Sequence, residues 1–221
     1  DANHAKNEFL SRVSHELRTP LATAQLRLHA LLAMALTPTQ ELEARKALAS
    51  LVDLNRRAEK LLQLSRAESG AALSGEPVNL AAVAATVVQD FWGDPALLDR
   101  VQLHVPSDDD IMVAGDFDTL AIVVRNLLEN ALRYSAGSTV EVIVEAPATI
   151  RVRDGGPGVA SDQLAQIRQR HVTKQRHSTG YGLGMSIVGT VVERHRGQLV
   201  LLSPPPGQAQ GFEAQVVLPA T

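Results

Sequence analysis

The chain has 221 residues, of which 45% are apolar, and it carries a formal net charge of −3 with no cysteine. This length accommodates one or two domains with a hydrophobic core. The small net charge gives no electrostatic basis for binding nucleic acid, and the absence of cysteine excludes disulfides and thiolate metal sites. No stretch approaches the roughly 20 apolar residues of a membrane span, and there is no signal-peptide pattern. We therefore expect no membrane contact from these residues.

The first two predicted elements are helices over residues 5–34 and 40–68, and each has an apolar seam. Seam positions lie mostly three or four residues apart, as on one face of an α-helix. The first seam consists of Leu10, Val13, Leu17, Leu21, Ala24, Leu28 and Leu31. The second consists of Ala44, Leu48, Leu51, Asn55, Ala58, Leu62 and Ser65. Because one hairpin would leave much of both seams in water, we predict a homodimer in which two hairpins form a four-helix bundle.

The start of the second helix is marked by the segment Thr37-Pro38-Thr39-Gln40. Thr37 suits the N-cap, Pro38 suits the first helical position, and Gln40 suits the third position of a capping box.

A histidine and a glutamate stand side by side in the first helix, in Ser14-His15-Glu16-Leu17-Arg18-Thr19-Pro20-Leu21. At about 100° per residue, His15 falls about 180° from the face centred on Val13 and Leu17. That position displays the imidazole to solvent, where it is available for chemistry. Taken alone, such a histidine is more often an ordinary surface residue.

A short segment of small residues at 70–76 predicts a linker between a first domain at 1–69 and a second at 77–221. In the second domain the patterns predict helices over 80–92, 116–134, 161–168 and 183–196. They predict strands near 101–105, 111–113, 139–145, 149–153, 198–203 and 212–218. This mixture favours an α+β sandwich with helices on one face of a mixed sheet.

The helix predicted over 116–134 has two unlike faces. With Asn126 set at 0°, Asn130 lies at about 40° and Arg133 at about −20°, opposite the apolar residues. Amide oxygens are suitable ligands for Mg²⁺, and a guanidinium suits phosphate oxygens. For this helix alone, a merely solvated polar face is an equally good interpretation.

Two glycine-rich segments follow, Asp154-Gly155-Gly156-Pro157-Gly158 and Gly180-Tyr181-Gly182-Leu183-Gly184. The first ends a predicted strand, where a carboxylate can accept a hydrogen bond from an adenine amino group and glycines allow close approach. The second precedes a helix, whose N-terminal amides attract phosphate. Alone, the first is a common turn. The second also occurs in dinucleotide folds, but no strand immediately precedes it here.

Together with Ser14–Leu21 and Asn126–Ala131, these segments resemble, in order, the H, N, G1 and G2 boxes of sensor histidine kinases. The resemblance extends over nearly the whole chain. It implies a dimerising phosphotransfer domain that forms a four-helix bundle, followed by an ATP-binding domain of the type shared by gyrase, Hsp90 and histidine kinases.

The resemblance also implies a site. His15 would accept the γ-phosphoryl group of ATP, Glu16 would accept the ring proton, and Thr19 would serve dephosphorylation of a response regulator. Asn126 and Asn130 would lie at the Mg²⁺ ion, with Asn130 favoured as its direct ligand. The other implied nucleotide contacts are Arg133, Tyr134, Asp154, Gly156, Gly158, Gly180, Gly182, Leu183 and Gly184.

By the same resemblance, the phosphoryl group passes from His15 to an aspartate of a separate response regulator. The chain would be the cytoplasmic part of a receptor in the bacterial inner membrane, with the sensor and membrane segments outside it. Two other functions stay open: an ATPase of the same fold without autophosphorylation, and a non-catalytic dimeric module that binds a regulator. The segment around His15 argues against the first, and the three boxes of the second domain argue against the other.

One segment departs from the family pattern. A box with phenylalanines is expected between the glycine-rich segments, but Ile167-Arg168-Gln169-Arg170-His171 contains no aromatic ring. The basic residues of 168–180 are candidates for a lid over the triphosphate, and a solvated loop is an equally good interpretation. A lid here would lack the usual apolar anchor.

Overall fold

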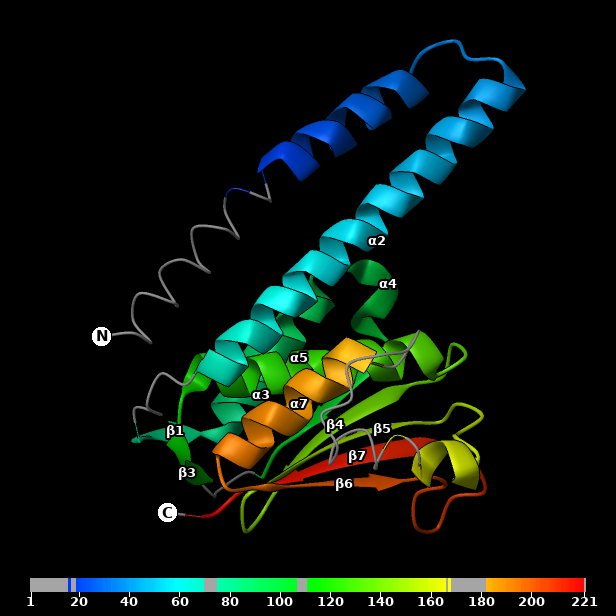
Figure 1. The fold of residues 1–221 in the computed structure, drawn as a ribbon. Helices are drawn as coiled ribbons and strands as arrows, with labels where there is room; N and C mark the ends of the chain where they lie inside the picture. The colour runs from blue at the N-terminus through cyan, green and yellow to red at the C-terminus, as the bar shows by residue number, and fades with distance from the viewer. Residues whose placement is uncertain are drawn as a thin grey trace. The chain divides into compact units, whose positions relative to one another are not determined.

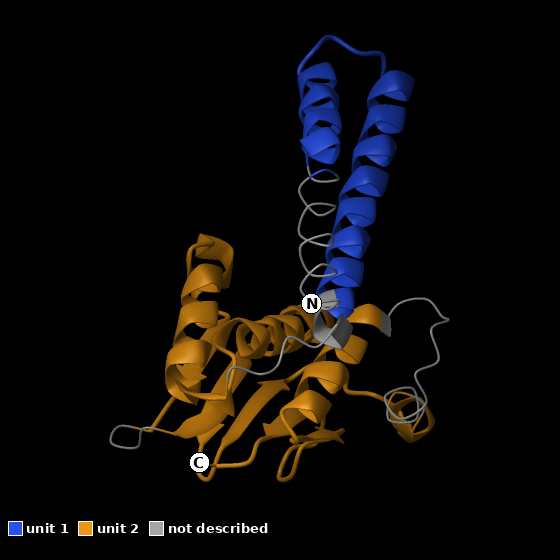
Figure 2. Cartoon of the chain, turned by 60° about the vertical axis from the view of Figure 1, so that its left-hand side comes forward, with its two compact units in different colours: residues 1–71 blue, residues 72–221 orange. Residues whose placement is uncertain are grey.

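The computed structural model describes residues 16, 19–69, 75–106, 111–165, 167 and 182–220. The chain divides into two compact units, residues 1–71 and 72–221, which Figure 2 distinguishes by colour. Each unit is described by itself. Within the described ranges, no helix is both long and apolar enough to cross a bilayer. The predicted linker lies mostly outside these ranges.

The first unit is a helical hairpin, formed by helical residues 19–32 and by α2 (Pro38–Ser69) (Figure 1). The Thr37 N–H donates to Gln40 Oε1 at 3.0 Å, and the Gln40 N–H donates to Thr37 Oγ1 at 3.4 Å. This reciprocal pair is the predicted capping box, and it starts the helix at Pro38, the position predicted as the first of the helix.

The hairpin leaves much apolar surface in water. Among its described side chains, Ala44 is the single buried apolar residue. Its large exposed apolar side chains are Leu26, Leu31, Met34, Leu42, Val52, Leu54 and Leu61. The hairpin therefore has almost no core of its own.

The second unit contains a five-stranded sheet in the order β2-β4-β5-β7-β6 and a small antiparallel sheet of β1 and β3. In the larger sheet β2 runs parallel to β4, and the other neighbours are antiparallel. The strands are β1 (Glu76–Asn79), β2 (Val101–His104), β3 (Met112–Gly115), β4 (Val140–Glu145), β5 (Thr149–Asp154), β6 (Gln198–Leu202) and β7 (Phe212–Val217). The helices are α3 (Leu80–Trp92), α4 (Pro95–Leu98), α5 (Phe117–Tyr134) and α7 (Gly182–Arg194), and residues 161–165 are also helical.

Helices α3, α5 and α7 lie on one face of the five-stranded sheet (Figure 1), which confirms the predicted α+β sandwich. Strand alternation selects the residues that face this layer. Ile150 and Val152 of β5 are buried, and so are Ala214 and Val216 of the adjacent β7. Because Asp154 has the same parity as Ile150 and Val152, the strand directs its carboxylate towards the helices.

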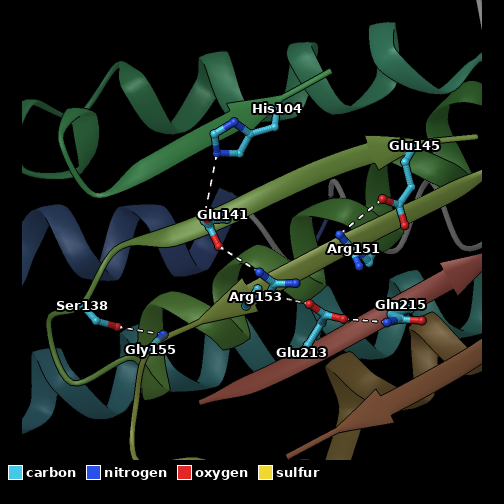
Figure 3. A network of polar contacts seen from close by, with 9 residues as sticks. All are labelled: His104, Ser138, Glu141, Glu145, Arg151, Arg153, Gly155, Glu213 and Gln215. Atoms are coloured by element: carbon cyan, nitrogen blue, oxygen red, sulfur yellow. Dashed lines mark hydrogen bonds and ion pairs between the residues drawn. The ribbon is translucent and has the colours of Figure 1, made fainter. Parts of the chain in front are cut away.

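The opposite face of the sheet carries a row of charged and polar side chains (Figure 3). Arg153 of β5 stands directly across from Glu141 of β4 and Glu213 of β7. Its Nε is 2.5 Å from Glu213 Oε2, and its Nη1 is 3.6 Å from Glu141 Oε2. Glu213 is fully buried, so the guanidinium supplies the opposite charge that a buried carboxylate needs.

The sequence patterns miss two elements, β1 and α4. Strand β1 contains Pro77 and only one buried apolar residue, Val78, so it has no readable alternation. Helix α4 has four residues, too few for a helical period, although its N-cap Asp94 and Pro95 are standard start signals.

Helix α7 was predicted to reach residue 196 but ends at Arg194. The Arg196 N–H donates to the Glu193 carbonyl at 3.0 Å, and the Gly197 N–H donates to the Val192 carbonyl at 2.9 Å. This pair of bonds is a Schellman motif, which requires a left-handed residue, and Arg196 has φ 55°. An exposed arginine therefore occupies a position that favours glycine.

We expect Arg196→Gly to raise the free energy of unfolding by about 0.5–1 kcal/mol, because glycine adopts this conformation without a side-chain clash. Urea unfolding followed by circular dichroism measures the change. Glu193→Gly is the matched control, since it places glycine inside α7 and should lower stability by about 1 kcal/mol. A destabilising Arg196→Gly substitution would contradict this account of the helix end.

Candidate functional site

A pocket opens in the second unit between α5, the start of α7 and the ends of β5 and β7. Its lining residues are Leu127, Asn130, Ala131, Tyr134, Val152, Asp154, Pro157, Gly158, Val159, Ile167, Met185, Phe212 and Ala214. Most of these are apolar, with a few polar groups among them. That composition is typical of a site for a small molecule with an apolar body.

Asp154 places a carboxylate inside this pocket. The residue is only 3% exposed, and its Oδ1 accepts a hydrogen bond from the Gly156 N–H at 2.9 Å. Burial raises the pKa of Asp154, while the backbone N–H groups of Gly156 and Phe212 act in the opposite direction. A carboxylate held in an apolar pocket can accept a further hydrogen bond from a bound ligand.

Two glycines let the chain after Asp154 pass close to its neighbours. A Cβ at position 156 would lie 2.4 Å from the carbonyl oxygen of Tyr134. Gly158 has φ +76°, and a Cβ there would lie 2.7 Å from Ser203 Oγ. Both positions thus require glycine, because other parts of the chain pass close to the backbone there.

The amides of α5 meet the first turn of α7. A Cβ at Gly184 would lie 3.1 Å from Asn126 Oδ1 and 3.6 Å from Asn130 Nδ2. Asn130 also lines the pocket. The structure therefore brings Asn126, Asn130 and Gly184 together, although 50 or more positions separate the asparagines from the glycine in the sequence.

Asn126 is not on a merely solvated face, which was one of the two interpretations of this side of the helix. It is 1% exposed, and its Nδ2 donates to the Ile122 carbonyl at 2.7 Å. Helix α7 packs on this face of α5 and covers it. Angles within one helix could not decide between the two interpretations, because they do not show which second element packs on its polar side.

Tyr134 and Arg133 close the last turn of α5. Tyr134 lines the pocket, and the Arg133 guanidinium lies 5.7 Å from the centre of its ring. Arg133 itself is exposed. Gly182 and Leu183 form the start of α7.

Several predicted site residues lie outside the described residues. These are His15, Gly180 and the candidate lid at 168–180. Of the other residues expected at the phosphorylation site, Glu16 is helical, and Glu16 and Thr19 are both exposed.

Sequence reasoning missed Ser203 and Gly211, which support the pocket from the connection between β6 and β7. Ser203 Oγ accepts from the Val159 N–H at 2.7 Å and donates to the Gly211 carbonyl at 3.0 Å. Gly211 has φ +114°, and a Cβ there would lie 2.4 Å from the Asp154 carbonyl oxygen. A glycine just before the last predicted strand was the available signal.

The described residues contain no cluster of three or more His, Cys, Asp or Glu side chains that would hold a metal ion by itself. The amide oxygens of Asn126 and Asn130 are nevertheless hard donors, and α7 approaches them closely at Gly184, where a Cβ would lie 3.1 Å from Asn126 Oδ1. These groups fit an ion that takes its remaining ligands from phosphate and water.

Comparisons with known proteins agree with both units. The family description "His Kinase A (phospho-acceptor) domain" matches residues 5–70, and "Histidine kinase-, DNA gyrase B-, and HSP90-like ATPase" matches residues 115–221. Sensor protein kinase PmrB of Pseudomonas aeruginosa is 36% identical over 231 aligned positions, which cover 100% of this chain and 47% of that protein. Signal transduction histidine-protein kinase BaeS of Escherichia coli is 33% identical, covering 97% of this chain and 47% of that protein.

Among solved structures, full-length ShkA in complex with AMPPNP shares the fold with a TM-score of 0.66 at 24% identity, covering 98% of this chain and 46% of that one. The chain spans about half the length of the curated relatives named here. A phospho-acceptor region followed by an ATPase region, matched along its whole length by named kinases, shows that this chain belongs to the sensor histidine kinases of bacterial two-component systems.

Proposed function

We propose that the chain transfers the γ-phosphoryl group of ATP to His15 and then to an aspartate of a response regulator. The observation that supports this most is the pocket of the second unit. It combines a buried carboxylate at Asp154, the amide of Asn130 and the start of α7 in one cavity. Family membership supports the kinase activity. Transfer of the phosphoryl group from His15 to the regulator is part of the proposal alone.

Asp154 would recognise the base. The exocyclic amine of adenine is a donor, and the Asp154 carboxylate is a buried acceptor in an apolar pocket. The ring would be covered by apolar lining residues such as Leu127 and Met185. A purine without that amine would leave the buried carboxylate unpaired, which is costly.

The triphosphate would lie towards the start of α7. Backbone N–H groups at a helix N-terminus attract phosphate, and Gly182 and Gly184 provide such groups without side chains that would block approach. Asn130, with Asn126 behind it, would hold Mg²⁺ there. When bound, this ion neutralises charge on the phosphate oxygens. Arg133, exposed at the end of α5, would add positive charge.

His15 would act as the nucleophile. A neutral imidazole nitrogen attacks the γ-phosphorus, the bond to the bridging oxygen breaks, and ADP leaves. Glu16 would take the proton from the other ring nitrogen. The reactive phosphorus–nitrogen bond would then be broken by an aspartate of the regulator.

We further infer that the chain works as a homodimer. The exposed apolar side chains of the hairpin support a second copy as the partner that covers them. Thr19, exposed at the first of the helical residues 19–32, would serve dephosphorylation of the regulator.

We expect His15→Gln to abolish acid-labile, base-stable labelling by radioactive ATP with Mg²⁺ while leaving ATP binding nearly intact. His29→Gln is the matched control, because His29 is an exposed histidine of the same hairpin. Asn130→Ala should lose both labelling and Mg²⁺-dependent binding. Histidine label that persists in His15→Gln would contradict the assignment. ATP turnover without any label would favour a plain ATPase, and failure to bind nucleotide would favour a non-catalytic module.

For Asp154→Asn we expect ATP binding to weaken by roughly 10- to 100-fold, because the acceptor loses its charge. The free energy of unfolding should not fall in this variant. Burial raises the pKa of Asp154 in the folded state, so the ionised carboxylate of the wild type destabilises the fold at pH values above that pKa. This destabilisation disappears as the pH falls to the pKa that Asp154 has in the unfolded chain. The variant should therefore be at least as stable at neutral pH, with a smaller advantage in acid.

Calorimetric titration and thermal unfolding across pH test this pair of changes. Asp162→Asn, at an exposed position, is the control. Loss of both stability and binding in Asp154→Asn would instead indicate a structural role.

We expect Thr19→Ala to impair dephosphorylation of the regulator at least several-fold more than autophosphorylation, since a hydroxyl is not needed to accept phosphate at His15. Both rates are measured on the same preparation with the cognate phospho-regulator. Thr23→Ala removes an exposed hydroxyl one turn further along the helix and should change neither rate. An equal loss of both activities in Thr19→Ala would argue against the assignment.

A further inference from the structure

Ser203 links three segments of the second unit. It follows β6, and its hydroxyl accepts from the Val159 N–H at 2.7 Å, in the loop after β5. The same hydroxyl donates to the Gly211 carbonyl at 3.0 Å, next to the start of β7. Figure 1 shows β5, β7 and β6 side by side in the sheet, so one side chain ties the ends of neighbouring strands.

The Val159 N–H and the Gly211 carbonyl, which Ser203 bonds, are both next to residues that line the pocket. Gly158 and Val159 line it directly, and a Cβ on Gly158 would lie 2.7 Å from Ser203 Oγ. The side chain therefore contacts this wall, although Ser203 is not itself one of the residues that line the cavity.

The bond to Gly211 reaches Asp154. The peptide unit that joins Gly211 to Phe212 is planar, so fixing its carbonyl also fixes the direction of the Phe212 N–H. Phe212 stands directly across from Asp154 in the sheet, its N–H lowers the pKa of that carboxyl group, and Phe212 itself lines the pocket. Gly211 further packs on the backbone of Asp154, where a Cβ would lie 2.4 Å from its carbonyl oxygen.

We propose that Ser203 is a positioning residue of the pocket, which holds the Asp154 carboxylate and the Gly158–Val159 wall in place to recognise the adenine base. The proposal rests on the proposed function, since it assigns adenine to this pocket. Ser203 acts on the end of the pocket that contains Asp154, whereas Asn126, Asn130 and Gly184 meet at the start of α7. Its hydroxyl therefore governs affinity and base preference and leaves phosphoryl transfer unchanged.

The test compares wild type with Ser203→Ala in the full 221-residue chain. Equilibrium titration gives the dissociation constants of ATP and of inosine triphosphate, which has a carbonyl oxygen in place of the 6-amino group. Removing a hydrogen-bonding partner from a support of the binding site should raise the ATP constant on the order of tenfold. The inosine triphosphate constant should change less than threefold, so that the preference for adenine falls. The rate of autophosphorylation at saturating ATP should stay within about twofold.

Two variants serve as controls. Ser203→Thr keeps the hydroxyl and should bind ATP within about threefold of wild type. Thr86→Ala removes an exposed hydroxyl of α3, which bonds only to its own helix through the Ala82 carbonyl in the described contacts, and should leave both constants unchanged.

An unchanged ATP constant in Ser203→Ala would overturn the inference. So would an equal loss for both nucleotides, or a Ser203→Thr protein that folds but binds ATP as weakly as Ser203→Ala. Failure of the wild type to bind ATP would instead overturn the proposed function, and this inference with it. If Ser203→Ala does not fold, amide exchange of Val159 in the wild type decides: slow exchange supports the bond, and exchange at the rate of an open loop overturns it.

Discussion

The burial of one carboxylate constrains much of the second unit. Asp154 ends a strand whose alternation directs it into the helical layer, where water is largely excluded. Such a charge destabilises the fold unless backbone groups solvate it, and the Gly156 N–H does so at 2.9 Å. The chain after the strand must then turn sharply beneath α5, which is possible only because a Cβ is absent at Gly156. The glycines are thus consequences of the carboxylate's position, and the pocket is the space that this arrangement leaves for a ligand.

The sequence indicates the chemistry of the pocket better than its support. Asp154 and Asn130 were predicted and line the pocket, because box residues carry their signal in local spacing. Ser203 and Gly211 were missed because their roles depend on which strands become neighbours. The order β5-β7-β6 places the connection after β6 beside the loop after β5, and no local pattern reveals this. The burial of Asn126 was missed for the same reason, since it results from α7 packing on α5.

In the secondary structure, too, features with a local sequence signal were predicted and features without one were not. Long elements with a clear period, such as α3 and α5, were predicted within about two residues, and the caps Thr37 and Asp116 fix where their helices begin. Errors occur where the signal is short or conflicts with the backbone. The four residues of β1 show no alternation, and α7 stops early because Arg196 takes a left-handed conformation in spite of its side chain. The apolar pattern would let the helix continue, but the chain turns after Arg196 and packs against β7. At Gly197 a Cβ would lie 2.6 Å from the Val217 carbonyl oxygen.

The two units differ in how far each can fold alone. The second unit buries aliphatic residues from both its helices and its sheet, and its pocket is lined entirely by its own side chains. The described part of the hairpin buries one apolar residue, Ala44, and exposes seven large ones. Apolar surface removed from water contributes roughly 25 cal/mol per Å², so a second surface that covers these seven side chains would stabilise the hairpin. The pocket of the second unit is thus lined by that unit alone, whereas the described hairpin residues leave apolar surface that a second copy would cover in the proposed homodimer. In the proposed homodimer, association would therefore act on the hairpin surface and not on the residues that line the pocket.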